Sequence, residues 1–275
     1  RRKLEGIITV KDLLLAPKEA VLRDIMETNI KFVSTHTDQE EAARALSKYD
    51  FLALPVVDAE ERLVGIVTVD DAIDVIQEEA TEDIEKMAAM APSDKPYMKT
   101  NVLDTWKKRV PWLLFLMISA TFTSAIINSF EDALAASVVL TGFIPMLMDT
   151  GGNSGSQSSI TIIRGLSLGE IRYADVPRIL LKESSVALLC GCTLAVANFI
   201  KLMVVDRVGL LVAGVVCLTL LMVVLVANIV GSTLPILAKR LGFDPTVMAS
   251  PLITTIVDAV SLVIYFNVAK ALLGI

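Results

Sequence analysis

Residues 112–130 read WLLFLMISATFTSAIINSF, a run of 19 residues without a charged side chain. A helix rises about 1.5 Å per residue, and about 20 apolar residues cross the hydrocarbon core of a bilayer. This stretch therefore predicts a transmembrane helix. Four further runs are candidates for membrane spans: residues 133–163, 184–205, 208–237 and 247–273. We expect an α-helical polytopic membrane domain of five transmembrane helices over residues 111–275.

Charge is divided unevenly along the chain. Residues 1–98 hold 12 Lys or Arg against 21 Asp or Glu, whereas residues 99–275 hold 13 against 10. Over the whole chain, 54% of residues are hydrophobic and the mean hydropathy is +0.63, which is high for a soluble protein. The sequence thus predicts an acidic soluble module followed by a domain in the lipid membrane. The negative charge of the module argues against nucleic acid as a partner.

Basic residues mark alternate ends of the predicted spans. They cluster at residues 107–109, between residues 164 and 182, and at residues 239–240, while Glu131-Asp132 and Asp206-Arg207 lie at the opposite ends. Positive side chains are enriched on the cytoplasmic side of membrane proteins. The pattern predicts a multi-pass protein of the cell (inner) membrane, with a cytoplasmic N-terminal module and an external C-terminus.

The acidic module contains an internal repeat. Residues 4–12 read LEGIITVKD and residues 63–71 read LVGIVTVDD, at an offset of 59 residues. Such a repeat indicates a duplicated folding unit. In each copy a β-branched run ends in Thr-x-x-Asp, which suits the N-terminus of a following helix. Between the copies we expect helices over residues 21–26 and 37–49, then a strand over residues 53–58.

Three segments of the module carry a family resemblance: Asp24-Ile25-Met26, Leu54-Pro55-Val56-Val57-Asp58 and Gly65-Ile66-Val67-Thr68. They resemble the cystathionine-β-synthase (CBS) domain, an α/β unit, with residues 1–17 as the end of a first repeat and residues 18–80 as the second. Pairs of such domains commonly bind adenine nucleotides. The resemblance places Thr68 and Asp71 near the ribose and phosphates. The alternative is that these two residues only cap a helix.

An acidic helix is expected next. Residues 70–86 contain eight carboxylates and a single lysine at the end. Those at positions 71, 74, 78, 82 and 85 fall on one helical face, where each like-charged pair costs roughly a few tenths of a kcal/mol. Divalent cations bound between them would remove this cost, and the alternative is a solvated acidic surface. Residues 81–110 would connect module and membrane, with a short surface helix over residues 96–109.

Polar groups interrupt two of the predicted spans. Residues 149–159 read DTGGNSGSQSS, which we expect to interrupt the span with irregular backbone that is either buried in protein or lines a water-filled cavity. Ser250, Thr254 and Asp258 follow one another at a spacing of four, and an ionisable residue within a span indicates a functional site. Oxygen ligands suit hard cations such as Mg²⁺ or Ca²⁺. The alternative for the Gly and Ser residues is close helix packing.

A second resemblance covers essentially the whole chain. It is carried by the CBS-like repeats, the acidic helix, Gly151-Gly152-Asn153-Ser154-Gly155-Ser156-Gln157, and the series Asp244-Pro245, Pro251, Thr254-Thr255 and Asp258. The chain resembles the MgtE family of magnesium channels and transporters. The resemblance implies a homodimer with the pore on its two-fold axis, closed by a Mg²⁺-sensing module when Mg²⁺ is plentiful. The family's N-terminal helical domain and most of its first CBS repeat are absent here, so regulation is expected to be incomplete.

The same resemblance assigns roles to residues. Asp258 would hold a hydrated Mg²⁺, with Ser250, Thr254 and Asn153 close to the ion path. The sensor would consist of nine carboxylates that bind regulatory Mg²⁺: Asp38, Glu40, Asp50, Asp71, Asp74, Glu79, Glu82, Asp83 and Asp244. ATP would be a further ligand, near Phe51, Thr68 and Asp71.

Two other functions fit the same residues. A proton- or sodium-coupled divalent-cation exporter would use Asp258 as a proton relay. A membrane nucleotide sensor would bind ATP without transport. An enzyme is not expected, because the sequence has no glycine-rich phosphate loop with a lysine, and its single histidine, His36, has no plausible triad around it.

Overall fold

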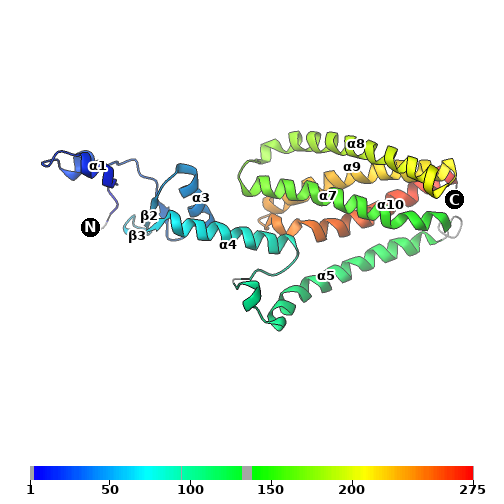
Figure 1. Ribbon diagram of the computed structural model, residues 1–275, viewed down its shortest axis with the longest axis horizontal. Coiled ribbons are helices and arrows are strands. Elements are labelled where there is room, and N and C mark those ends of the chain that lie inside the picture. The colour runs from blue at the N-terminus through cyan, green and yellow to red at the C-terminus, as the bar shows by residue number, and fades with distance from the viewer. Residues whose placement is uncertain (1–2, 94, 132–137, 275) are drawn as a thin grey trace. The chain divides into compact units, whose positions relative to one another are not determined.

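The computed structural model describes residues 3–93, 95–131 and 138–274, and the side chain of Ser250 is outside the described part. The chain divides into two compact units, residues 1–82 and residues 83–275. Short helices and a small sheet make up the first unit, and long helices make up the second (Figure 1).

The first unit is built around a three-stranded sheet. Its elements are α1 (Val10–Leu15), α2 (Leu22–Ile25), β1 (Val33–Ser34), α3 (Gln39–Tyr49), β2 (Ala53–Val57), β3 (Leu63–Thr68) and the beginning of α4 (Val69–Met87). β1 pairs with β2 in parallel, and β2 pairs with β3 in antiparallel orientation. The apolar faces of α3, β2 and α4 pack together in one core, which contains the buried side chains of Leu46, Leu54 and Ala72. The expected helices, the strand and the acidic helix are thus confirmed.

The two copies of the sequence repeat fold differently. In both copies the threonine and the aspartate three residues later hydrogen-bond each other at a helix start, Thr9 with Asp12 and Thr68 with Asp71. β3 of the second copy pairs with β2 along its length. The first copy has only isolated bridges in the described part, one of them between Ile7 and Glu27. The Thr9 hydroxyl accepts from the backbone N–H of Asp12, so the prediction that the threonine caps the helix is confirmed for the first copy. In the second copy the Asp71 carboxylate accepts from the backbone N–H of Thr68. Both copies can form these bonds because they are local, whereas a strand needs a partner.

The second unit is a bundle of long helices around α9. Its elements are η1 (Tyr97–Lys99), α5 (Val102–Ser129), η2 (Val138–Phe143), α7 (Ile144–Ser167), η3 (Tyr173–Asp175), α8 (Val176–Lys201), η4 (Leu202–Asp206), α9 (Leu210–Arg240), η5 (Pro245–Met248) and α10 (Ser250–Leu273). α9 packs against α7, α8 and α10, while α5 packs against α10 (Figure 1). Tyr265 and Phe266 of α10 are fully buried among apolar side chains.

Four segments in the described part are long and apolar enough to cross a membrane: Val102–Ser129, Tyr173–Asp206, Leu210–Arg240 and Pro245–Leu273. They correspond to four of the predicted spans. The fifth, over residues 133–163, is not among them, and its residues 133–137 lie outside the described part. α7 has 24 residues, enough at about 1.5 Å each to cross the hydrocarbon core. Its polar segment lowers its hydropathy, and the count of five spans is not confirmed.

Two predictions about local structure are wrong. Residues 149–159 do not interrupt a helix, because α7 runs through them without a break. A continuous helix pairs its backbone groups internally, which apolar surroundings demand. Residues 96–109 do not form a separate surface helix either. η1 is followed by α5, which continues from its polar first turns through Pro111 into the apolar span.

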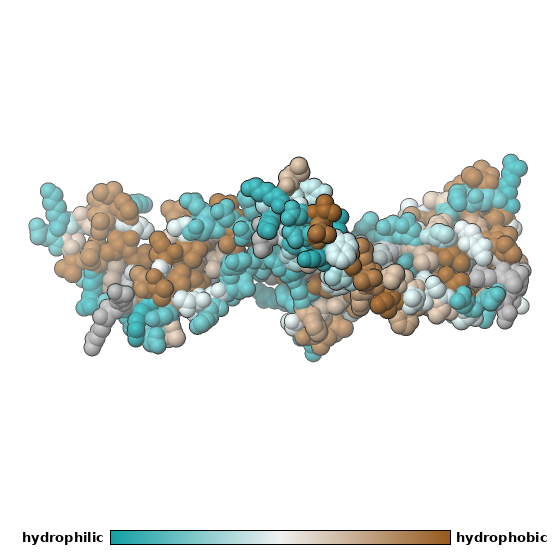
Figure 2. Space-filling view, turned by 90° about the horizontal axis from the view of Figure 1, so that it is seen from below, coloured by the Kyte–Doolittle hydropathy of each residue, from teal (hydrophilic) through white to brown (hydrophobic). Residues whose placement is uncertain are grey.

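α5 presents a large apolar surface. No side chain of its most apolar window is buried, and Leu113, Met117 and Phe122 are each at least 60% exposed. In Figure 2 apolar side chains lie on the outside of the second unit, beside pale and polar ones. Apolar side chains exposed along a whole helix, as on α5, are covered by lipid or by another protein surface.

Candidate ion pathway

Glycines bring α7 close to its neighbours. A Cβ atom at Gly155 would lie 2.9 Å from the Ile253 side chain of α10 and 3.1 Å from the backbone oxygen of Ala227 in α9. A Cβ atom at Gly231 of α9 would overlap the carbonyl oxygen of Gly155. Only glycine permits this approach of two backbones. The alternative expectation for these residues, close helix packing, is therefore confirmed.

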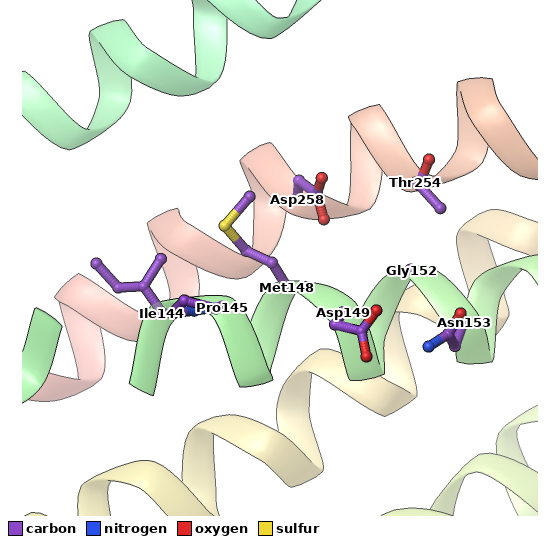
Figure 3. Close-up of a pocket in the computed structure, with 8 residues that line it drawn as sticks. All are labelled: Ile144, Pro145, Met148, Asp149, Gly152, Asn153, Thr254 and Asp258. Atoms are coloured by element: carbon purple, nitrogen blue, oxygen red, sulfur yellow. The ribbon is translucent and has the colours of Figure 1, made fainter. Parts of the chain in front are cut away.

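A cavity of about 410 Å³ lies between α7 and α10. Figure 3 shows its lining residues, with Asp149 and Asn153 on α7 and Thr254 and Asp258 on α10. The remaining lining residues are Ile144, Pro145, Met148 and Gly152. Two carboxylates, an amide and a hydroxyl thus face one space that holds several water molecules. This set of oxygens suits a hard, partly hydrated cation.

The sequence prediction named some of the residues that line this cavity, and their role in an ion path stays a prediction. Asn153, Thr254 and Asp258 are brought together as expected, and the structure does not describe the side chain of Ser250. Asp149 was not predicted as a site residue. It precedes Asn153 by four positions on α7, so this spacing was the available signal.

A polar stripe continues from the cavity along α7. Asp149, Asn153, Gln157 and Thr161 recur every four residues, and all four are exposed in the described chain. The hydroxyl of Thr161 donates a hydrogen bond to the backbone oxygen of Gln157, 2.8 Å away. Acidic and amide groups at membrane depth do not face lipid without a large cost. The stripe therefore requires water or protein against it.

Hydrogen bonds behind the stripe fix the rotation of α7. The Ser158 hydroxyl donates to the Glu183 carboxylate of α8 at 2.8 Å. The Asn228 amide of α9 donates to the Ser154 hydroxyl at 2.6 Å, and Ser159 donates to the backbone oxygen of Met248 at 2.9 Å. These bonds hold one face of α7 against three other elements. The opposite face, which carries Asp149 and Asn153, is thereby turned outward.

Comparison with known proteins identifies the family of the chain. A sequence profile described as divalent cation transporter, that of the MgtE family, matches residues 144–268, and a CBS domain profile matches residues 22–78. The chain is 43% identical over 272 residues to the magnesium transporter MgtE of Thermus thermophilus, an alignment that covers 98% of this chain and 60% of that protein. The chain belongs to the MgtE family. This is a family of membrane transporters, which is not an enzyme class.

Two further matches are to other proteins named MgtE. The magnesium transporter MgtE of Bacillus subtilis is 37% identical over 270 residues, covering 98% of this chain and 59% of that protein. A crystal structure of the cytosolic domain of the Mg²⁺ channel MgtE in complex with ATP aligns with 27% of this chain and 30% of that one, at 50% identity and a TM-score of 0.27. The chain spans about 60% of the length of its curated MgtE relatives.

The carboxylates assigned to the MgtE sensor lie on several elements. Asp38 caps α3, Glu40 pairs with Arg44, and Glu79 accepts a hydrogen bond of 2.8 Å from the Gln39 amide. Asp50 ends α3 in a left-handed conformation.

The remaining sensor carboxylates lie elsewhere: Asp71, Asp74, Glu82 and Asp83 belong to α4, and Asp244 precedes η5. Within the described residues no three acidic, His or Cys side chains gather as a metal site, so the sensor stays a prediction.

The residues assigned to ATP form local contacts. The Thr68 hydroxyl donates to the Asp71 carboxylate at 2.7 Å, and this hydrogen bond lowers the pKa of Asp71 below its usual value. Phe51 stacks on Tyr49 with ring centroids 5.5 Å apart and packs against the core of the first unit. The helix-cap interpretation of Thr68 and Asp71 describes what these contacts do. A nucleotide at this place stays a prediction.

Proposed function

We propose that this chain forms part of a protein that carries Mg²⁺ across the cell membrane, with the cation passing between α7 and α10. The observation that carries the proposal is the cavity lined by Asp149, Asn153, Thr254 and Asp258. Mg²⁺ dehydrates reluctantly, and a roomy site with few carboxylates suits an ion that keeps most of its water. Membership of the MgtE family supports the same substrate.

The polar stripe on α7 supports a homodimer. Asp149, Asn153, Gln157 and Thr161 are exposed on a helix of membrane-spanning length. A second copy related by a two-fold axis would place two such stripes opposite each other, and water between them would form the ion path. α7 would then be the fifth spanning helix. The positive-inside pattern supports a cytoplasmic N-terminal unit and an external C-terminus.

Mg²⁺ uptake by reconstituted protein tests this function. Vesicles that contain the full chain and a trapped Mg²⁺-sensitive dye should take up Mg²⁺ when it is added outside, driven by its own gradient. Vesicles without protein serve as the control. Dependence of the flux on an imposed pH or Na⁺ gradient would instead indicate a coupled exporter. Absence of flux together with ATP binding would indicate a nucleotide sensor.

Asp149→Asn should weaken cation entry without abolishing transport. A unit charge several ångströms from the ion contributes about 1 kcal/mol at the intermediate dielectric of a wet cavity, a factor of about five. The Mg²⁺ concentration for half-maximal uptake should rise by about this factor. Glu131→Gln, which removes an exposed carboxylate that does not line the cavity, should leave it unchanged. If both variants gave the same Mg²⁺ concentration for half-maximal uptake, Asp149 would not lie on the ion path.

The acidic face of α4 should be necessary for inhibition by internal Mg²⁺. Mg²⁺ bound between apposed acidic faces would favour the closed state by its higher affinity for that state. The triple variant Asp74→Asn, Glu78→Gln and Glu82→Gln should therefore keep transporting at internal Mg²⁺ concentrations that stop the wild type. A control variant neutralises three exposed glutamates outside α4, at positions 19, 41 and 60. Unchanged inhibition in the α4 variant would contradict the sensor role.

A further inference from the structure

An ion pair joins the end of α4 to the segment that leads into α10. Lys86 lies in the last turn of α4, and its Nζ is 2.7 Å from Oδ2 of Asp244. Asp244 lies between α9 and η5, and η5 is followed directly by α10. Both side chains are partly buried, with 26% of Lys86 and 36% of Asp244 exposed. The Lys86 ammonium group is therefore bound to the Asp244 carboxylate, which the MgtE resemblance assigns to regulatory Mg²⁺.

The two oxygens of Asp244 have different tasks. Oδ1 caps η5, because it accepts hydrogen bonds from the backbone N–H of Thr246 at 2.9 Å and from the Thr246 hydroxyl at 2.5 Å. Oδ2 meets Lys86. Partial burial raises the pKa of Asp244, but Lys86 and Thr246 outweigh this effect and hold the pKa below its usual value. The carboxylate is thus fixed in place and charged, with one oxygen directed at a cation.

The end of α4 is also tied to the start of α5. The Glu85 carboxylate accepts a hydrogen bond of 2.6 Å from the backbone N–H of Ser93, and Lys108 of α5 donates one of 2.6 Å to the backbone oxygen of Pro92. The backbone N–H of Ala91 donates to the oxygen of Lys108 at 3.1 Å. The last turn of α4 is therefore held both at α5 and at Asp244, which directly precedes η5 and α10.

We propose that Lys86 is a tethered counter-cation of Asp244, which regulatory Mg²⁺ must displace to reach this carboxylate. A lysine ammonium is a compact point charge on a flexible stem, so it can leave without a change of fold. Its tether gives it a high local concentration, against which free Mg²⁺ competes. Lys86 thereby raises the Mg²⁺ concentration at which Asp244 takes up the metal. This inference rests on the proposed sensing of Mg²⁺, and its first test does not depend on transport.

Chemical labelling of lysines tests the displacement directly. The purified full chain is treated briefly with an amine-acylating reagent at a series of Mg²⁺ concentrations, and the modification of each lysine is measured by mass spectrometry. Labelling of Lys86 should rise several-fold as Mg²⁺ replaces the ammonium at Asp244. Lys99, an exposed lysine of η1, is the control and should not change. Labelling of Lys86 that stays constant or falls with Mg²⁺ would overturn the proposal, whether or not the protein transports.

Substitution of Lys86 gives a second, independent readout. Lys86→Gln removes the competitor, and because partly exposed ion pairs are weak, Mg²⁺ inhibition of flux should shift to about two- to fivefold lower concentration. Lys86→Arg keeps the charge and should restore the wild-type value, and Lys99→Gln should behave as wild type. A purely structural role of Lys86 predicts the opposite shift, or none, in Lys86→Gln. Either of those results would contradict the counter-cation role.

Discussion

Replacing Asp258 by Asn should reduce Mg²⁺ uptake by about 10- to 100-fold. Asp258 is the one carboxylate that α10 contributes to the cavity, and it is half-buried there. A hydrogen bond to a charged group contributes about 1.5–3 kcal/mol of binding free energy. About 1.4 kcal/mol corresponds to a factor of ten in an equilibrium constant. Asn has nearly the same shape but no charge, so the water around a bound cation would lose one of its two carboxylate acceptors. Uptake is measured in vesicles matched for the amount of reconstituted protein.

The interpretation of this variant depends on its folding. Asp258→Asn should elute from a gel-filtration column in detergent as the wild type does, because the cavity already tolerates polar groups. Asn267→Ala provides a control on the same helix, since Asn267 is exposed and its amide donates only to the backbone of its own helix in the contacts described. A folded Asp258→Asn protein with wild-type uptake would place the ion path elsewhere.

Gly231→Ala should unfold or disassemble the membrane unit. The added Cβ would overlap the carbonyl oxygen of Gly155, and neither backbone can move away because both helices are packed on α10 as well. Overpacking of a tight interior typically costs about 1–3 kcal/mol and more where backbone must shift. We expect a loss of thermal stability in detergent, measured as the temperature at which half of the protein leaves the monodisperse gel-filtration peak.

Gly214 offers a matched control on the same helix. It also belongs to α9, but no side chain or backbone beyond its own stretch of that helix lies within 4 Å of a Cβ added there. Gly214→Ala should therefore match or slightly exceed the wild-type stability, because alanine is the better helix former. Similar melting temperatures for the two alanine variants would mean that the contact between α7 and α9 at Gly155 does not hold the bundle together.

The sequence was sufficient for features that depend on local chemistry or on long periodic patterns. The apolar runs located four long helices, and the Thr-x-x-Asp pattern located the starts of α1 and α4. Asn153, Thr254 and Asp258 were correctly expected to lie near one another, because the family resemblance carries information on spatial proximity. Hydropathy and spacing by themselves do not provide it.

The remaining features depend on packing that a single sequence does not display. DTGGNSGSQSS suggested irregular backbone, yet its glycines are the contact surface of an unbroken helix, since small residues let α9 and α10 approach. Asp149 was missed because its neighbour across the cavity is more than 100 positions away on α10. Lys86 and Asp244 are 158 positions apart, so no local pattern joins them. Their pairing became visible only in the folded bundle.

The central claim is that cations pass through the cavity between α7 and α10 and along the polar stripe of α7 that continues from it. Accessibility of single cysteines on this stripe tests the claim most directly. Cys190, Cys192 and Cys217 are first replaced by alanine, and one cysteine is introduced as Gln157→Cys or Thr161→Cys on the stripe. Val196→Cys, on an exposed apolar position of α8, is the control. Mg²⁺ uptake is recorded before and after a charged, water-soluble thiol reagent. Our account predicts that the reagent blocks uptake at positions 157 and 161 but not at 196. Uptake that persists after both stripe cysteines have been modified would contradict it.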